Sequence, residues 1–406
     1  MYVIKVPLAM QGLEDIDLAI IGEVFASGNH TMGLLVKDFE SQFAKKIGAS
    51  HAVMVNSGSS ANLLALEAIV RPSWKDNITF PSGSYIALPA VLWPTTLWPI
   101  VQLGYRALLI DCEPNSLKMD INLLRQAKKE FGDTLVGAYV IHPLGASLDL
   151  EEISQLRTEE NLFIIEDTCE SLGSGNHGKF SGTAGNIGTF SFYFSHHMTT
   201  VEGGMVVTND QVIANDLVSM RAHGWIRDRA DKAEIQKEFP DISPEFLFYS
   251  SGYNFRPMEF QGALGLSQLK RLDSFIEKRI DNAQYIENHL NTDKIKMFDS
   301  DKLKSPLNKL LPENSWMALP FLLDPKVDRN AVRRILAKNG VDSRPIIAGN
   351  FINQPAAKNL SISVYKELKN AEKIHANGFM LGNHHNFSKS QLDLIVKSLN
   401  TSMGVQ

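Results

Sequence analysis

The sequence predicts an α/β fold with a mostly parallel central sheet and a smaller α+β part toward the C-terminus. Between residues 52 and 208, short apolar runs of strand length alternate with segments of helix length. This alternation is typical of parallel strands that are joined by crossover helices. Two long helical patterns and a region of mixed elements follow. The chain has 406 residues, of which 44% are hydrophobic and 21% charged, enough for a sizeable core in two or three domains.

The spacing of apolar residues predicts each element in turn. Helical spacing appears first, over 13–25 and 34–47. The strands expected in the large sheet are 52–56, 85–88, 107–110, 135–141, 162–166, 188–192 and 205–208. Later helices are expected at 260–272, 274–290, 329–339 and 391–399, with one more strand at 317–322. The polar stretch 228–245 has neither pattern, so we expect a surface loop there.

The change of pattern near residue 273 predicts a domain boundary. Up to that point the chain alternates strands with helices, and beyond it the elements are fewer and mixed. We therefore expect a large domain over 1–272, which includes the N-terminal helical segment. The remaining residues, 273–406, are expected to form a small C-terminal domain.

Composition and charge argue against several classes of partner. With 40 Lys and Arg against 45 Asp and Glu, the chain has a formal net charge of −5, whereas nucleic-acid binding needs a basic excess or a basic stripe. We find neither an export signal nor an apolar run of membrane-spanning length. The sequence thus predicts a cytoplasmic protein with no nucleic-acid or membrane partner. Its two cysteines, Cys112 and Cys169, are too few for a four-thiolate iron–sulfur or zinc site.

Two strand ends carry groups that could bind an anion and a cation. Ser57, Gly58 and Ser59 follow the strand at 52–56 and open a helix. Unpaired N–H groups at such a helix start can bind a phosphate or a carboxylate, although this segment by itself favours a plain helix cap. Asp167 follows another apolar strand. Ligands bind at the carboxyl ends of parallel strands, so this acid is well placed to pair with a cationic group, unless it is only a solvated loop residue.

A third strand end carries two histidines before a Glu-Gly-Gly turn at 202–204. An imidazole at this place, His196 or His197, can act as a general base near neutral pH. A zinc site would need more ligands at metal-like spacing, so no metal is predicted. Adjacent side chains on an extended chain point to opposite faces, so at most one of the two histidines faces a given site. We assign His196 to the site and His197 to the structure.

The order of these segments resembles the sugar aminotransferase family of fold-type I pyridoxal-phosphate enzymes. The Arg-Ala-His-Gly run at 221–224 and the Gly-Tyr-Asn-Phe-Arg-Pro run at 252–257 follow in the same order, and the resemblance extends from Thr31 to His384. It implies an aspartate-aminotransferase-like fold and a cofactor that alternates between pyridoxal 5′-phosphate (PLP) and pyridoxamine 5′-phosphate (PMP).

The resemblance also implies roles for individual residues. Asp167 matches the acid that pairs with the pyridine nitrogen, and Trp93 matches the aromatic residue that stacks on the ring. Gly58, Ser59 and Ser191 match positions that hold the phosphate. Asn254 matches one that reaches the phosphate of a neighbouring subunit, which implies a homodimer with shared active sites.

The chain departs from the aminotransferases at one decisive position. His196 stands where they carry the Schiff-base lysine, and an imidazole has no primary amine. The Ser-His-His run before Glu-Gly-Gly, together with Glu170, is similar to the dehydratase branch of the family, which makes 3,6-dideoxy sugars for polysaccharides such as O-antigen or capsule. The tail motifs at 343–346, 349–351 and 382–384 resemble its GDP-sugar member. A Lys-to-His variant of an aminotransferase and a cofactor-fold binding or regulatory protein remain as alternatives.

The resemblance to this branch implies a reaction. L-Glutamate would convert PLP to PMP and leave as 2-oxoglutarate, and the amine form would meet the C4 ketone of a nucleotide-linked sugar. His196 would move the proton, the C3 hydroxyl would leave, and ammonia would be released. GDP-4-keto-6-deoxymannose is the expected substrate, with a heptose analogue as the alternative. The candidates for contacts with glutamate or the sugar nucleotide are His223, Tyr253, Arg256 and Arg344.

Overall fold

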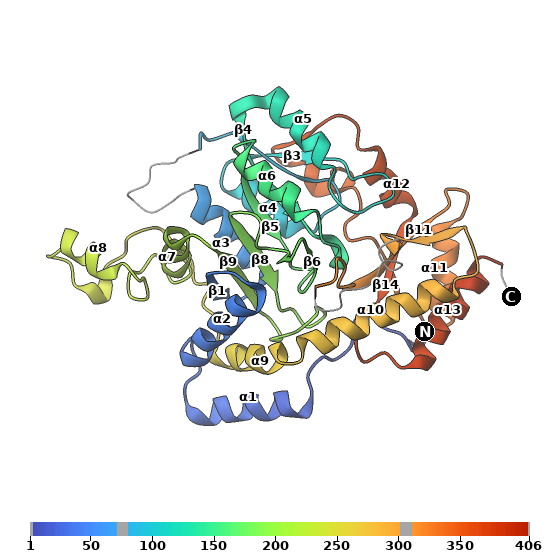
Figure 1. Cartoon of the computed structure of the whole chain (residues 1–406), viewed down its shortest axis with the longest axis horizontal. Helices are drawn as coiled ribbons and strands as arrows, with labels where there is room; N and C mark the ends of the chain where they lie inside the picture. Colours follow the sequence, from blue (N-terminus) through green and yellow to red (C-terminus); the bar gives the residue numbers. More distant parts are fainter. Residues whose placement is uncertain (1–2, 71–79, 301–310, 405–406) are drawn as a thin grey trace.

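The computed structural model describes residues 3–70, 80–300 and 311–404 (Figure 1). Its helices are α1 (Asp15–Ser27), α2 (Leu34–Ile47), α3 (Gly58–Val70), α4 (Pro94–Gln102), α5 (Ile121–Phe131), α6 (Leu150–Thr158), α7 (Gln211–Met220), α8 (Lys232–Glu238), α9 (Glu259–Leu269), α10 (Leu272–His289), α11 (Arg329–Lys338), α12 (Lys369–Asn377) and α13 (Lys389–Ser402). Within these described ranges, no helix is long and apolar enough to cross a membrane.

The strands of the main sheet are β1 (His51–Val55), β2 (Tyr85–Pro89), β3 (Arg106–Ile110), β4 (Leu135–Ile141), β5 (Phe163–Asp167), β8 (Ile187–Ser191), β9 (Gly204–Thr208) and β13 (Ile362–Val364). The smaller sheets contain β6 (Gly175–Asn176), β7 (Lys179–Phe180), β10 (Ile295–Met297), β11 (Ala318–Leu323), β12 (Ser343–Pro345) and β14 (Gly378–Gly382). Every strand that the apolar spacing predicts has a counterpart here, shifted by one residue or so. The short strands β6, β7, β10, β12 and β13 were not predicted, because two or three residues are too few for a periodic signal. Strand β14 was not predicted either, because its apolar run is only three residues long between two glycines.

The large sheet is mostly parallel, as predicted. Its strand order is β1-β9-β8-β5-β4-β2-β3-β13, and among the described strands only β9 runs against the others. Acidic residues start the covering helices: the side chains of Asp120, Asp149 and Asp210 accept hydrogen bonds from the first-turn amides of α5, α6 and α7. Because the strands other than β9 run in the same direction, they all end at one edge of the sheet, where ligands bind in such folds.

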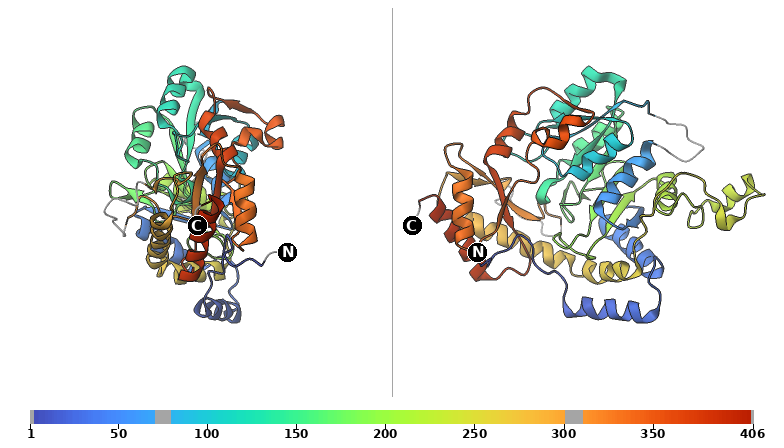
Figure 2. Two further views of the ribbon diagram at one scale, coloured as in Figure 1. Left: turned by 90° about the vertical axis from the view of Figure 1, so that its right-hand side faces the viewer. Right: turned by 180° about the vertical axis from the view of Figure 1, so that it is seen from behind.

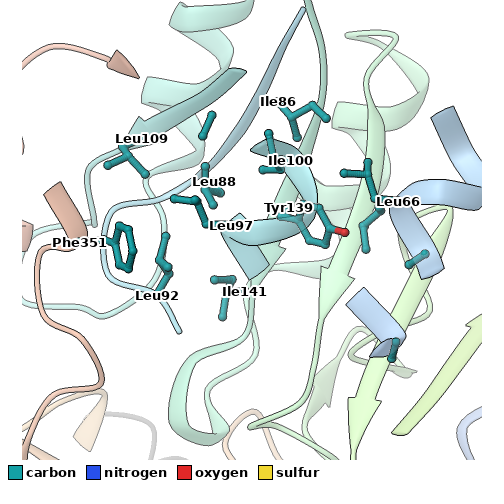
Figure 3. Close-up of a cluster of buried hydrophobic side chains, with 14 of the residues drawn as sticks. Leu66, Ile86, Leu88, Leu92, Leu97, Ile100, Leu109, Tyr139, Ile141 and Phe351 are labelled. Carbon is teal, nitrogen blue, oxygen red and sulfur yellow. The ribbon is translucent and has the colours of Figure 1, made fainter. Parts of the chain in front are cut away.

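Apolar side chains cover both faces of this sheet. Alternate residues of β2 and β3 point to opposite faces: Leu88 and Leu109 pack with α3 and α4, whereas Ala87 and Leu108 pack with α5 and α6. Figure 3 shows the first of these clusters, with Tyr139 reaching toward α3. The Tyr139 hydroxyl donates to the carbonyl of Asn62 at 2.7 Å, so the core itself ties α3 to the sheet beneath the strand ends.

A second, antiparallel sheet, β10-β11-β14-β12, lies in the C-terminal part of the chain. The long helix α10 runs from the large sheet toward it, beneath both in Figure 1. The proposed division at 272/273 coincides with the start of α10. One element crosses that division, because β13 pairs with β3 in parallel and extends the large sheet. The division into domains 1–272 and 273–406 remains our proposal.

The stretch 228–245 projects from the body of the molecule. The prediction of a loop was wrong for part of it, because Lys232–Glu238 forms helix α8. Only Ile235 of this helix is buried, so its short polar sequence has no apolar stripe to reveal it. Figure 1 and the right-hand view of Figure 2 show α8 standing away from the two sheets. Arg229 anchors its base, donating to Asp216 at 2.7 Å and to Asp231 at 2.8 Å.

Candidate active site

A cavity of about 560 Å³ opens at the carboxyl ends of the parallel strands. We call it the active-site cavity. Eight of the twelve predicted site residues line it: Gly58, Ser59, Trp93, Asp167, Glu170, Ser191, His196 and Arg344. They come from five places that are far apart in the sequence. They meet because β1, β2, β5 and β8 end at the same edge of the sheet.

One end of the cavity is built for an anion. Helix α3 begins at Gly58, where the first N–H groups of a helix lack intrahelical partners. A Cβ on Gly58 would lie 2.6 Å from the Cβ of Ser191, and a Cβ on Gly204 would lie 2.3 Å from the carbonyl oxygen of Ser57. Both glycines are thus needed for the close approach of β8 and β9 to the helix start. Ser57 is also a helix cap, since its Oγ accepts from the amide of Ser60 at 3.1 Å.

Asp167 also lines the cavity and is held in one orientation. Its Oδ2 accepts hydrogen bonds from Asn62 Nδ2 at 2.8 Å and from Thr96 Oγ1 at 2.7 Å. Its Oδ1 accepts from the backbone amide of Cys169 at 3.1 Å. Thr189 Oγ1 donates to Asn62 Oδ1 at 2.6 Å, which turns the Asn62 amide nitrogen toward the acid. Oδ1, with fewer donors than Oδ2, has more capacity left for a ligand.

Trp93 and Glu170 are further parts of the cavity wall. The indole of Trp93 lines the cavity and is still 57% exposed, so its face is open to a planar ring. Glu170 Oε2 accepts from the amide of Leu144 at 3.0 Å. Burial is the main cause that raises the pKa of Glu170 to about 7; Asp167 adds to it and the Leu144 bond opposes it. This carboxyl can therefore exchange a proton near neutral pH.

His196 reaches the cavity from the turn after β8. Its Nδ1 lies 3.5 Å from the Oγ of Ser195, and its backbone amide donates to the carbonyl of Tyr193 at 3.0 Å. Burial, followed by the positive charge of Arg279, lowers the pKa of His196 to about 4. The ring is therefore neutral at neutral pH and can accept a proton.

His197 faces away from the cavity, as expected. Its side chain is buried, and Nε2 donates to the carbonyl of Ser315 at 3.2 Å. The prediction relied on the alternation of side chains along an extended strand, but the physical reason is different. β8 ends at Ser191, so the two histidines lie in a turn, not on an extended chain.

Asn254 and Arg256 lie outside the active-site cavity. They line another depression of about 550 Å³, the second hollow, whose charged residues include Lys37, Arg227 and Asp228. Asn254 is exposed, and its Oδ1 accepts from Arg256 Nε at 3.1 Å. In the part of the chain that the structure describes, neither residue reaches the cavity of its own chain.

His223 and Tyr253 are not among the residues that line the cavity either. The amide of His223 donates to the carbonyl of Tyr253 at 2.8 Å. The hydroxyl of Tyr253 hydrogen-bonds the buried carboxylate of Glu67 at 3.0 Å, and its ring stacks on Phe255 at 4.5 Å. These contacts give Tyr253 a place in the packing of its own chain.

Residues 13–400 match the model of the DegT/DnrJ/EryC1/StrS aminotransferase family. The chain belongs to this family. The family and the fold that the motifs indicated are thus confirmed. The GDP-4-keto-6-deoxy-D-mannose 3-dehydratase of Escherichia coli O55:H7 is 37% identical to it over 391 residues, which are 94% of this chain and 96% of that protein.

Solved structures of the same dehydratase share the fold of this family member. One is a histidine-to-asparagine variant of GDP-4-keto-6-deoxymannose-3-dehydratase with bound GDP-perosamine, with a TM-score of 0.88 and 34% identity. Another holds a trapped PLP-glutamate geminal diamine, with a TM-score of 0.87 and 34% identity. In both cases the match covers 97% of this chain and 100% of the other.

The cavity of this DegT/DnrJ/EryC1/StrS family member fits the predicted PLP cofactor. PLP needs a dianion site, a flat apolar face and an acid for its ring nitrogen. The α3 start beside Ser191, the open face of Trp93 and the oriented Asp167 match these three needs.

The sequence motifs left several cavity residues without a role. Asn62 and Thr96 orient Asp167, and Tyr193 and Glu202 line the cavity. Asn62 follows the Ser-Gly-Ser-Ser motif at 57–60 by two residues, and this nearness is the one signal that could have revealed it. Thr96 sits on a helix turn with no signal of its own, because its partner is 71 residues away.

Proposed function

We propose that this chain is a PLP- and PMP-dependent 3-dehydratase of a nucleotide-linked 4-keto-6-deoxy sugar. The substrate is GDP-4-keto-6-deoxymannose, and L-glutamate is the amino donor that leaves as 2-oxoglutarate. One observation carries the proposal: His196, in place of a Schiff-base lysine, lines one cavity together with Asp167 and the anion site at α3. The relatives named above are 3-dehydratases by name, and they match nearly the whole chain. This favours the proposed function over an altered aminotransferase or a regulator.

The chain's own groups would hold the cofactor at three points. The α3 start, Ser59 and Ser191 bind the phosphate, and Trp93 covers the ring. Asp167 holds the proton of the pyridine nitrogen. Glu170 is our further candidate for a cofactor contact. Bound in its amine form, the cofactor supplies an amino group for the C4 ketone and an electron sink for the proton loss.

His196 supplies the proton chemistry. Its neutral imidazole takes the proton from the C4′ carbon of the cofactor and can return it to the C3 hydroxyl as that group leaves. Having no primary amine, His196 cannot recapture the cofactor aldehyde as a lysine would.

The reaction balances without a further reductant. Glutamate is oxidised to 2-oxoglutarate, and its two electrons reduce the C–OH of C3 to CH₂. The water lost from C3 equals the water used when the C4 nitrogen leaves as ammonia.

Arg344 is our candidate for the negatively charged parts of the two substrates. Its guanidinium is exposed at the cavity, and Nη1 lies 3.0 Å from Asp342 Oδ1. A planar guanidinium can bind the carboxylate of glutamate or the diphosphate of the sugar nucleotide with two parallel hydrogen bonds.

We propose a homodimer in which the second hollow of one chain closes the cavity of the other. Asn254 then reaches the partner's phosphate, and Arg256 and His223 face the partner's substrate. Tyr253, bonded within its own chain, has the weakest claim to such a contact. Exposed apolar residues support a covered surface: Leu34 and Met258 border the second hollow, and Phe194 and Val201 flank His196 in the sequence.

The test is to mix the purified protein with PLP, L-glutamate and GDP-4-keto-6-deoxymannose. Ammonia equal to 2-oxoglutarate, with a sugar nucleotide that has lost one oxygen, is the expected result. An amino sugar without ammonia would identify an aminotransferase. 2-Oxoglutarate alone would mean that the sugar is wrong, and a heptose analogue is then the next substrate to try. If no 2-oxoglutarate forms at all, the proposal that this chain is a glutamate-dependent enzyme is wrong.

A further inference from the structure

Arg279, on helix α10, is fully buried directly behind the turn that carries His196. Its Nη2 donates to the carbonyl of His196 at 3.1 Å, and its Nη1 donates to the carbonyl of Met317 at 3.0 Å. Nη1 also donates to the carbonyl of Asn383. Among the described residues, no carboxylate pairs with this guanidinium. One arginine thus joins three segments of the chain through their backbone carbonyls.

A buried arginine without a carboxylate is unusual, because burying an unpaired charge is costly. Burial lowers the pKa of Arg279 to about 9, so the side chain still carries its charge at neutral pH. In the part of the chain that the structure describes, backbone carbonyls are the partners that stabilise this charge. A side chain needed only for packing could be apolar at lower cost.

The tail motif at 382–384 forms the far side of this arrangement. Asn383 Nδ2 donates to the carbonyl of Arg279 at 3.0 Å and to that of Trp316 at 2.8 Å. Asn282, one turn along α10, donates to Asn383 Oδ1 at 3.0 Å. The motif therefore fixes both the backbone and the guanidinium of Arg279, which in turn bonds the backbone of His196.

We propose that Arg279 is a positioning residue for His196. Its guanidinium fixes the turn that aims the imidazole into the cavity, and it places a positive charge behind the ring that disfavours the imidazolium. This inference rests on the proposed function, in which His196 begins the reaction as a neutral base. In this arrangement the tail motif at 382–384 acts on His196 only through Arg279.

The surroundings of His196 give the charge of Arg279 a defined direction of effect. On its own turn His196 has Tyr193, Ser195 and His197 as neighbours. Across the cavity lie Asp167, Glu170, Glu202 and Arg344, and behind Arg279 lie His384 and His385. Burial and then Arg279 lower the pKa of His196 to about 4. The same two causes lower the pKa of His384 to about 3. Removing the charge must therefore raise the pKa of His196 and move the acid limb of the rate profile to higher pH.

The experiment compares two substitutions in the holoenzyme. Arg279→Lys keeps the positive charge but loses the planar guanidinium that bonds several carbonyls at once. We therefore expect kcat to fall about tenfold, with the acid limb of the pH–rate profile unmoved. Arg279→Met removes both, so kcat should fall about a hundredfold and the acid limb should shift to higher pH. The matched control is Arg329→Lys, another arginine that donates to two carbonyls, those of His375 and Gly378, but outside the cavity. It should leave the rate profile unchanged.

A folded Arg279→Met enzyme with an unmoved acid limb would overturn the proposal. If neither Arg279 variant folds, NMR titration of the histidine rings in the wild-type protein can still refute the proposal. The signal of His196, assigned by its loss in His196→Asn, should not titrate near the ordinary value of about 6.5. A normal titration there would also refute the proposal. This readout needs no substrate, so it stands apart from a failure of the proposed dehydratase activity.

Discussion

The active-site cavity and the second hollow contain residues from the same sequence motifs, yet they differ in how they are built. The cavity is framed by strand ends, a helix start and a core that ties them together, and Asp167 is buried with three hydrogen-bond donors. In the second hollow, Asn254 and Arg256 are exposed and bond each other. One chain suffices to arrange the first set of residues, whereas the second set acquires a role only in the homodimer that we propose.

This difference teaches how far a parallel sheet can organise a site. Strand ends from residues 55 to 191 converge because the sheet order brings β1, β8, β5, β4 and β2 to one edge. The loop around Asn254 is instead held by single backbone hydrogen bonds, such as that from the Phe255 amide to the Arg221 carbonyl at 3.0 Å, and Asn254 lines the second hollow. Substitutions in the two regions should therefore have effects of different size and kind.

The largest effect is expected in the cavity, from His196→Asn. Without the general base, kcat should fall about a thousandfold, within the usual range for losing such a group. Cofactor absorption and sugar-nucleotide binding should stay close to wild type, since the phosphate and ring-nitrogen contacts are elsewhere. Steady-state kinetics and a binding titration measure the two quantities. Dehydration at the wild-type rate would remove His196 from the mechanism.

An intermediate effect is expected in the second hollow, from Asn254→Ala. Loss of one hydrogen bond to a charged phosphate costs about 2 kcal/mol, so cofactor affinity should fall about thirtyfold while kcat at saturating PLP changes little. A PLP titration followed by absorbance gives the affinity. If affinity is unchanged, Asn254 does not reach a phosphate.

Mixed dimers sharpen this prediction. In a dimer of one His196→Asn chain and one Asn254→Ala chain, each shared site takes residue 196 from one chain and residue 254 from the other. One site then has both substitutions, and the other site has neither. At a PLP concentration that leaves Asn254→Ala homodimers empty, a random mixture should recover about a quarter of wild-type activity. No recovery would mean that each chain supplies its own complete site.

The smallest effect is expected from Tyr253→Phe, next to Asn254 in the sequence. It removes the hydrogen bond to Glu67 and keeps the stacking on Phe255. The free energy of unfolding should fall by about 1 kcal/mol, with kcat/KM within about twofold of wild type. Urea unfolding and steady-state kinetics measure these two outcomes. A large loss of kcat/KM with unchanged stability would return Tyr253 to the substrate contacts.

Much of the fold and of the cavity was predictable because short-range patterns encode them. Apolar runs mark the strands, and the Ser-Gly-Ser-Ser and Glu-Gly-Gly motifs mark places where two backbones approach too closely for a Cβ. The loop prediction at 228–245 failed for Lys232–Glu238, since a helix with one buried residue leaves no pattern. The short strand β13 escaped for a similar reason, because its three residues are too few to form a periodic pattern.

The sequence by itself determined the family, the chemistry of the strand ends and the absence of a lysine at the position of His196. Those properties depend on residue identity and local spacing. Only the tertiary structure decided that Asn62 and Thr96 orient Asp167, that Arg279 grips the turn of His196, and that Asn254 lies away from its own cavity. The first two depend on contacts between residues about 70 or more apart in the chain, and the third depends on the absence of such a contact. No local pattern records where such distant segments meet.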